Sequence, residues 1–118
     1  MGSVLRDKSY LFALRIVKLY KYLTKKHSEY TLSKQVLRSG TSIGALVREA
    51  QYAQSTKDFI NKLSIALKEA NESEYWIMLL KDSEFITKKM HDSVQLDNKE
   101  IKKMLTSSIN TAKNKLKQ

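Results

Sequence analysis

Hydrophobic residues recur every three to four positions in four separate stretches of this chain. This spacing places them on one face of an α-helix. The first stretch runs from Ser3 to Lys26 and the second from Thr31 to Gln54. The third follows Ser55-Thr56, which can cap a helix N-terminus, and the fourth runs from about Thr87 to the chain end. The pattern predicts four amphipathic helices.

The apolar positions of each stretch are the expected core, and residues 82–86 are expected to connect the last two helices. Asp97 and Asn98 interrupt the apolar stripe of the fourth stretch, where we expect a kink or break. The expected core positions are Leu5, Phe12, Ile16, Leu19, Leu23, Leu32, Val36, Ser39, Ile43, Leu46, Ala50, Ala53, Phe59, Leu63, Ala66, Leu67, Ala70, Ile77, Leu80, Met90, Val94, Ile101, Leu105, Ile109, Ala112 and Leu116.

The composition supports long helices over strands. The chain has no proline and only three glycines, whereas strand-rich folds need turn residues at short intervals. Four helices of about 20–30 residues with short connections favour an antiparallel arrangement of neighbours. We therefore expect an all-α fold, an antiparallel up-and-down four-helix bundle, formed by a single domain over residues 1–118.

Two glycines, Gly40 and Gly44, lie inside the second predicted helix. Together they should cost about 2 kcal/mol of helix stability relative to alanine. Close approach of a neighbouring backbone is the expected compensation. The sequence therefore predicts tight helix packing here, within the bundle or between subunits.

A carboxylate, Glu69, falls within the apolar arc of the third predicted helix, where a charge is costly without a partner. Arg38 and Glu49 lie on one edge of the second helix, and each could meet a partner on the third. We expect Arg38 to pair with Glu69 and Glu49 with Lys62. An ion-pair network that fixes helix register is one interpretation; a ligand or catalytic site is the alternative.

No motif for metal, cofactor or nucleophile chemistry is present. A di-iron bundle needs Glu-x-x-His pairs, but Glu69 is followed by Glu72, and neither histidine stands in that pattern. The glycines match neither a P-loop nor a dinucleotide fingerprint. We expect no enzyme activity, metal, cofactor or small-molecule substrate. With no apolar run long enough to span a membrane and no secretory signal, a cytoplasmic location is expected.

The net charge of +10 is large for 118 residues and favours a polyanionic partner. Residues 1–30 hold seven Lys and Arg against two acidic residues, and residues 81–118 hold nine against five. Lysine-rich helix faces suit phosphate contact with little sequence specificity, although a merely solvated face is the alternative. The candidate nucleic-acid-binding residues are Arg15, Lys18, Lys21, Tyr22, Lys25, Lys26, Lys99, Lys102 and Lys103.

Tyr75, Trp76 and Leu79 extend the apolar surface of the third helix beyond what one packing seam needs. Exposed apolar area commonly marks association between chains. These three residues are candidate interface residues of a homo-oligomer, with burial of Trp76 in the core of the bundle as the alternative.

The segment from Arg38 to Leu80 resembles one bacterial family closely. The residues that carry the likeness are Arg-Ser-Gly-Thr-Ser-Ile-Gly-Ala at 38–45, Glu-Ala at 49–50, and the run from Asp58 to Tyr75-Trp76 and Leu80. The family consists of four-helix-bundle proteins encoded in intervening sequences of 23S ribosomal RNA genes. A related bundle is the accessory protein of diversity-generating retroelements, a basic pentamer associated with nucleic acid.

The resemblance implies a bundle that assembles as a homopentamer and has no established enzymatic activity. It also implies framework or interface roles for Arg38, Glu49, Glu69, Glu72 and Trp76. The leading hypothesis is a non-enzymatic, oligomeric bundle that binds structured RNA or DNA through its lysine-rich faces. The rival is an oligomeric protein-interaction scaffold with no direct role in nucleic-acid binding.

Overall fold

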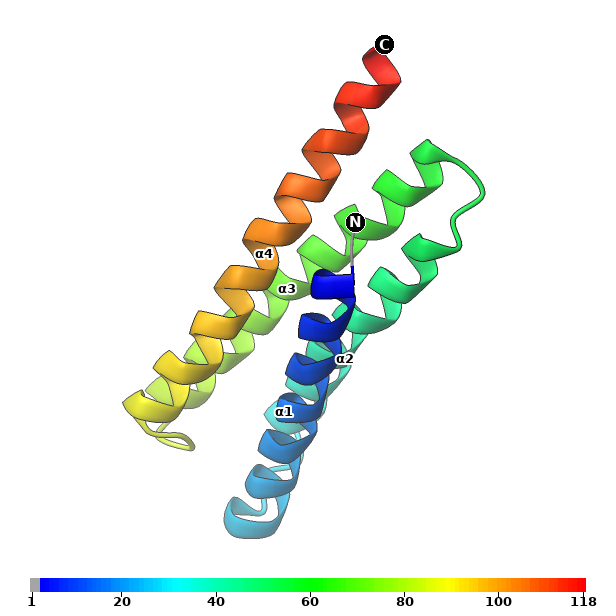
Figure 1. Cartoon of the computed structure of the whole chain (residues 1–118). Helices are drawn as coiled ribbons and strands as arrows, with labels where there is room; N and C mark the ends of the chain where they lie inside the picture. The colour runs from blue at the N-terminus through cyan, green and yellow to red at the C-terminus, as the bar shows by residue number, and fades with distance from the viewer. Residues whose placement is uncertain (1–2) are drawn as a thin grey trace.

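Four antiparallel helices form an elongated bundle of 52 × 21 × 20 Å in the computed structural model, which describes residues 3–118 (Figure 1). The helices are α1 (Ser3–His27), α2 (Leu32–Gln51), α3 (Thr56–Asp82) and α4 (Lys88–Lys117). Each helix contacts the next in sequence, and α1 also contacts α4. The predicted all-α four-helix bundle is confirmed; Met1 and Gly2 of the predicted domain lie outside the described residues.

The turn between α1 and α2 is fixed by one carboxylate. Glu29 accepts hydrogen bonds from the backbone N–H groups of Thr31, Leu32 and Ser33 at 3.2, 3.0 and 2.7 Å. The Ser33 hydroxyl donates back to the Glu29 carbonyl at 2.8 Å. Ser28 takes a left-handed conformation with φ of 51°, and the N–H of Glu29 bonds the Leu23 carbonyl. The start of α2 and the end of α1 are therefore capped together.

Two other helix starts are capped by hydroxyl groups, of which the Ser55 cap was predicted and the Thr87 cap was not. Ser55 accepts from the Asp58 N–H at 3.0 Å before α3, and Thr87 accepts from the Met90 N–H at 3.1 Å before α4. Each bond satisfies one of the donors that a helix N-terminus leaves unpaired. These caps set the connections α2–α3 and α3–α4 close to the positions that the sequence predicts.

Most of the predicted core is buried, with corrections at several positions. The expected core residues that are only half-buried, besides Leu46, are Leu32, Ala53, Phe59, Leu67 and Met90. Val47 is fully buried where Leu46 was expected, and Leu46 is only half-buried. Val47 lies about two turns after Gly40, on the face of α2 that packs closely against α1, whereas Leu46 is rotated by about 100° from it around the helix. Leu116 is 48% exposed, because the end of α4 extends beyond the start of α1 (Figure 1).

The expected break in the fourth helix is wrong, because α4 is continuous from Lys88 to Lys117. Asn98 is fully buried, and its side-chain amide donates to the Ala70 carbonyl of α3 at 2.9 Å. The polar side chain in the apolar stripe thus forms a hydrogen bond with a neighbouring helix and does not interrupt α4. A second buried polar contact joins the Ser73 hydroxyl of α3 to that of Ser39 of α2 at 2.8 Å.

The glycines of α2 make the close approach that the sequence predicted. A Cβ atom on Gly40 would lie 2.7 Å from Cγ1 of Ile16 on α1, well inside van der Waals contact. A Cβ atom on Gly44 would lie 3.2 Å from the Ser9 carbonyl oxygen. The α1–α2 seam is therefore an internal packing seam that requires at least one residue without a side chain.

Candidate nucleic-acid interface

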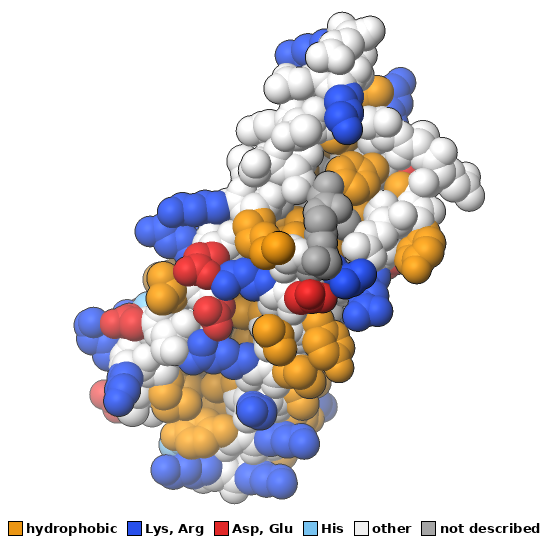
Figure 2. Space-filling model, viewed as in Figure 1, with side chains coloured by type: hydrophobic (Ala, Val, Ile, Leu, Met, Phe, Trp, Pro, Cys, Tyr) orange, Lys and Arg blue, Asp and Glu red, His pale blue; other side chains and the backbone are white. Residues whose placement is uncertain are grey.

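The outer face of α1 is divided along its length into an apolar half and a basic half. Its N-terminal half exposes large apolar side chains, and its C-terminal half exposes lysines, as Figure 2 shows at the lower end of the molecule. The exposed apolar residues are Val4, Tyr10, Leu11 and Leu14. The exposed lysines are Lys18, Lys21, Lys25 and Lys26. Exposed cations of this kind suit contact with phosphate groups.

The four lysines of the basic half are free to bind. Within residues 3–118, none of them forms an ion pair with a carboxylate. The Lys26 ammonium lies 5.4 Å from the centre of the Tyr22 ring, close enough for a cation–π contact. The lysines are solvated cations whose binding to a polyanion would break no ion pair of the bundle.

Two other α1 candidates are already engaged inside the bundle. Arg15 donates to Asp97 at 2.8 Å and to the carbonyl and hydroxyl oxygens of Ser93, all on α4. Tyr22 is half-buried, and its hydroxyl lies 3.2 Å from Nε2 of His27. The structure thus places both residues in contacts that hold helices and turns together.

The lysines of α4 form a second basic surface. Lys99 and Lys103 are exposed, whereas the Lys102 ammonium lies 3.2 Å from the Asn71 side chain and 3.0 Å from the Glu74 carboxylate on α3. Lys99 and Lys103 form no ion pair with any residue that the structure describes. Lys102 therefore acts as a brace between α3 and α4, while its two neighbours remain available.

The two basic surfaces extend in opposite directions along the bundle. The Arg15–Asp97 pair shows that these positions on α1 and α4 lie at the same level of the bundle. From that level Lys25 lies ten residues toward one end and Lys103 six residues toward the other, which is roughly 24 Å along the bundle axis at about 1.5 Å per residue. The relative placement of the two surfaces is a feature that the helical pattern of each stretch could not reveal.

The polar residues of the α2–α3 seam form the two pairs that the sequence predicted. Arg38 donates to Glu69 at 2.8 Å and also contacts Glu72, and the Lys62 ammonium lies 3.7 Å from Glu49. The Glu69 side chain is only 14% exposed, while that of Arg38 is 51% exposed. The cluster braces the outside of the seam and leaves one side of the guanidinium in solvent.

The candidate interface residues of α3 lie beside this cluster. The Trp76 indole N–H donates to Glu72 at 3.0 Å, and its ring is half-buried and meets Tyr75 edge to face at 5.0 Å. Tyr75 is half exposed and Leu79 is partly covered. Trp76 is thus placed at the rim of the core and not within it.

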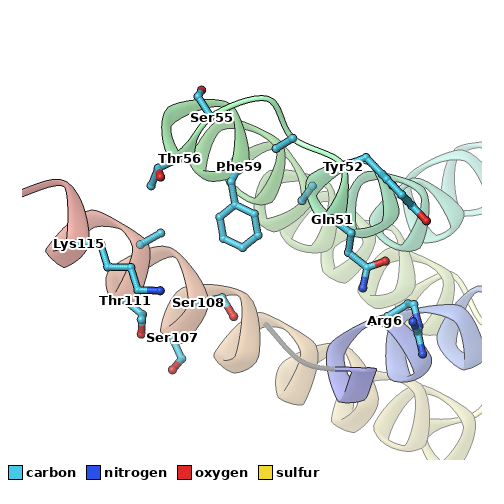
Figure 3. A pocket seen from close by; sticks show the side chains of 13 residues that line it. Arg6, Gln51, Tyr52, Ser55, Thr56, Phe59, Ser107, Ser108, Thr111 and Lys115 are labelled. Atoms are coloured by element: carbon cyan, nitrogen blue, oxygen red, sulfur yellow. The ribbon is translucent and has the colours of Figure 1, made fainter.

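A pocket of about 720 Å³ lies at the opposite end of the bundle from the α1–α2 turn (Figure 3). It lies where α4 and the α2–α3 turn extend past the start of α1, and Phe59 projects into it. Hydroxyls of α4 and the side chains of Arg6 and Lys115 also line it, and its described lining includes no carboxylate or histidine. No acid–base pair for catalysis is assembled there.

Metal-ligand side chains do not gather within residues 3–118, where no cluster of three His, Asp or Glu is close enough to hold an ion. His27 packs between the Tyr22 and Phe85 rings, and His91 bonds Asp92 at 2.8 Å. Both histidines are therefore occupied by local contacts. None of the described helices is both long and apolar enough to cross a membrane.

Fold and surface together define a basic, all-α four-helix bundle without an assembled catalytic site in the described residues. The family model for 23S rRNA-intervening sequence proteins matches residues 3–107, and the chain belongs to that family. It is also similar to a crystal structure of a protein of unknown function from the S23 ribosomal protein family of Bacteroides thetaiotaomicron VPI-5482. The two are 58% identical with a TM-score of 0.88, over 89% of this chain and 97% of the other. Comparison with curated proteins gave no match.

Proposed function

We propose that this chain is a non-enzymatic protein that binds RNA or DNA through the lysines at the C-terminal half of α1. The observation that carries the proposal is that Lys18, Lys21, Lys25 and Lys26 are exposed and form no ion pair within the described chain. Binding phosphates releases counterions and breaks no bond of the bundle, so the energetic balance favours association. Lysine contacts of this kind discriminate little between sequences.

Lys99 and Lys103 are exposed on the second basic surface. They would contribute to binding only if one nucleic acid, or an oligomer of this chain, spans the basic surfaces of α1 and α4. Arg15, Tyr22 and Lys102 are removed from the proposed set because each already bonds another part of the bundle. The candidate nucleic-acid-binding residues that remain are the lysines that form no ion pair within the described chain.

The test compares two charge-reversal variants with equal changes in charge. One carries Lys18, Lys21, Lys25 and Lys26 replaced by Glu, and the control carries Lys99, Lys103, Lys113 and Lys117 replaced by Glu; each lowers the net charge from +10 to +2. Binding to a labelled RNA hairpin is measured across salt. The α1 variant should lose binding and its salt dependence, while the α4 variant should retain most of both.

Unchanged binding of the α1 variant would overturn the assignment, and loss in the α4 variant alone would move it to α4. No binding of the wild type even at low salt would overturn the nucleic-acid function itself. If the wild type bound polyglutamate but not RNA, the protein-interaction scaffold would be favoured. Circular dichroism of each variant shows that its helices are retained.

We also propose that the chain assembles as a ring, with five copies as the number that the family resemblance implies. Within residues 3–118 no Cα atom of α1 lies within 8 Å of one in α3, so the two helices lie diagonally across the bundle. Both helices expose apolar side chains: Tyr10, Leu11 and Leu14 on α1, and Tyr75 and Met78 on α3. Two different apolar faces on opposite sides favour head-to-tail contacts over a two-fold dimer, and such contacts form a ring when the rotation between copies closes.

The oligomeric state in solution tests this assembly. Leu11→Glu with Leu14→Glu should give monomers in light scattering after gel filtration, and so should Tyr75→Glu, because each removes one side of the same contact. Lys103→Glu, on an exposed position of α4, is the control and should leave the assembly unchanged. A monomeric wild type would overturn the ring.

A further inference from the structure

One aromatic side chain stands exposed at the end of the bundle that carries the free lysines. Tyr30, in the turn between α1 and α2, is 55% exposed. Both sides of the turn are fixed, since Ser28 adopts its left-handed conformation and Glu29 bonds three backbone N–H groups of the next residues. The tyrosine is therefore presented from a rigid backbone, and little backbone ordering is required when it binds a partner.

The other tyrosine at this end is not available in the same way. Tyr22 is half-buried, its hydroxyl is bonded to His27, and Lys26 lies over its ring. A base could not stack on Tyr22 without displacing these neighbours. Of the two tyrosines at this end, Tyr30 is therefore the one whose ring is available to contact a ligand.

Positive charge surrounds the tip. Lys25, Lys26 and Lys34 are exposed and unpaired within residues 3–118. The α3–α4 connection lies alongside, because the Phe85 ring meets His27 at 5.8 Å. The start of α4, which follows it, adds exposed Lys89 and Lys88, and Lys88 pairs with Asp92.

The acidic residues near the tip do not cancel this charge. Glu29 is held by backbone donors, and Asp82 lies 3.7 Å from the Lys81 ammonium. Glu84 is the exposed exception, in the α3–α4 connection. The lysines on the α1–α2 side therefore leave a cationic rim beside the tyrosine.

We propose that this tip, formed by Tyr30 with Lys25, Lys26 and Lys34, binds unpaired nucleotides by stacking one base on the tyrosine ring. Base–aromatic stacking combined with lysine contacts to the flanking phosphates is the general chemistry of single-strand recognition. Paired bases are stacked inside a duplex and cannot reach a convex tip, so a loop or a single-stranded segment is the class of ligand that fits. The inference rests on the proposed nucleic-acid function and names the part of the nucleic acid that is bound.

The experiment uses two labelled RNA probes of equal length: a hairpin with a ten-nucleotide loop, and a blunt duplex. Wild-type protein should bind the hairpin about tenfold more tightly, the scale of one stacked base. Tyr30→Ala should lose this preference while its duplex affinity is unchanged, and Tyr30→Phe should retain it because the ring remains. Tyr52→Ala is the matched control, since Tyr52 is 85% exposed at the other end of the bundle and should not affect either probe.

Retention of the loop preference in Tyr30→Ala, or equal binding of both probes by the wild type, would overturn the tip as a stacking site. Those outcomes leave the phosphate contacts of α1 intact. Failure of the proposed function is distinguishable, because the wild type would then bind neither probe at any salt concentration.

Discussion

α1 is held by its two neighbours in different ways. Against α2 it packs so closely that Gly40 has no room for a side chain beside Ile16. Against α4 it makes far fewer contacts, and those on the surface are polar: Arg15 with Asp97 and Ser93, and Lys8 with Glu100. One seam depends on shape and burial, whereas the other adds exposed charges that salt can screen.

The difference shows how one helix can serve both the core and a surface. The side of α1 that meets α2 and the centre of the bundle carries the buried residues Phe12, Ile16 and Leu23. Its outer side is left for the exposed apolar residues and lysines. The proposed ring contacts and nucleic-acid contacts therefore use α1 without disturbing the seam that fixes it.

The largest expected effect comes from filling the α1–α2 seam. Gly40→Ala should gain about 1 kcal/mol of helix propensity but lose more, because its Cβ would overlap the fully buried and branched Ile16 side chain. We expect a net loss of about 1–2 kcal/mol in the free energy of unfolding, measured by urea denaturation. In Gly44→Ala the Cβ would meet the Ser9 carbonyl at 3.2 Å, so its gain and loss should nearly cancel.

A second variant shows whether the Gly40 effect is steric. Ile16→Ala alone should destabilise the bundle by about 2–5 kcal/mol, because it opens a cavity in the core. Combined with Gly40→Ala it should cost less than the sum of the single changes, since the added methyl group then occupies part of that cavity. Additive effects would show that the seam is looser than the structure indicates.

The same comparison explains what the sequence could predict. Gly40 and Gly44 were informative because glycine inside a helix is costly, and the Arg38–Glu69 pair because a carboxylate in an apolar arc needs a partner. Each signal can be read from a single helix, because each is a residue that would destabilise that helix without a compensating contact. The sequence alone therefore predicts a close approach to α2 and the brace between α2 and α3.

Other features depend on how the helices are placed relative to one another, which one helical pattern does not contain. The exchange of Leu46 for Val47 follows from the side on which α1 packs. The helical pattern of α1 placed Arg15 on a basic face available for binding, but Asp97 of α4 lies beside it and accepts a hydrogen bond from it. The offset between the two basic surfaces along the bundle depends on the level at which α1 meets α4. The candidate lysines were therefore predictable as residues, but not in their placement relative to one another.

A smaller effect is expected at the turn that joins the two helices of the tight seam. Burial raises the pKa of Glu29, but the backbone donors of Leu32, Ser33 and Thr31 outweigh it and hold the pKa below its ordinary value of 4.5. A lowered pKa in the folded state gives stability that is present above the ordinary value and is lost as pH falls through the folded one. Glu29→Gln should lower stability at pH 7 by about 1 kcal/mol, the scale of a helix cap.

The pH dependence separates this effect from a loss of packing. Between pH 7 and pH 3 the stability of Glu29→Gln should fall less than that of the wild type, measured by urea denaturation at each pH. Glu84→Gln, an exposed change in the other turn at the same end, should follow the wild type. Parallel curves for Glu29→Gln and wild type would show that the carboxylate does not cap α2.

The smallest effect is expected on the α4 side of α1. Arg15 and Asp97 are each 36% exposed in their side chains, so water and salt screen their attraction. Arg15→Met keeps the aliphatic stem and should cost less than about 1 kcal/mol at low salt. At 1 M sodium chloride this cost should shrink, whereas that of Gly40→Ala should stay the same because steric overlap is not screened. A double-mutant cycle with Asp97→Asn isolates the energy of the Arg15–Asp97 pair. If the stability lost in Arg15→Met did not depend on salt, Arg15 would stabilise α1 through packing or through its bonds to Ser93. The two sides of α1 would then be more alike than their contacts indicate.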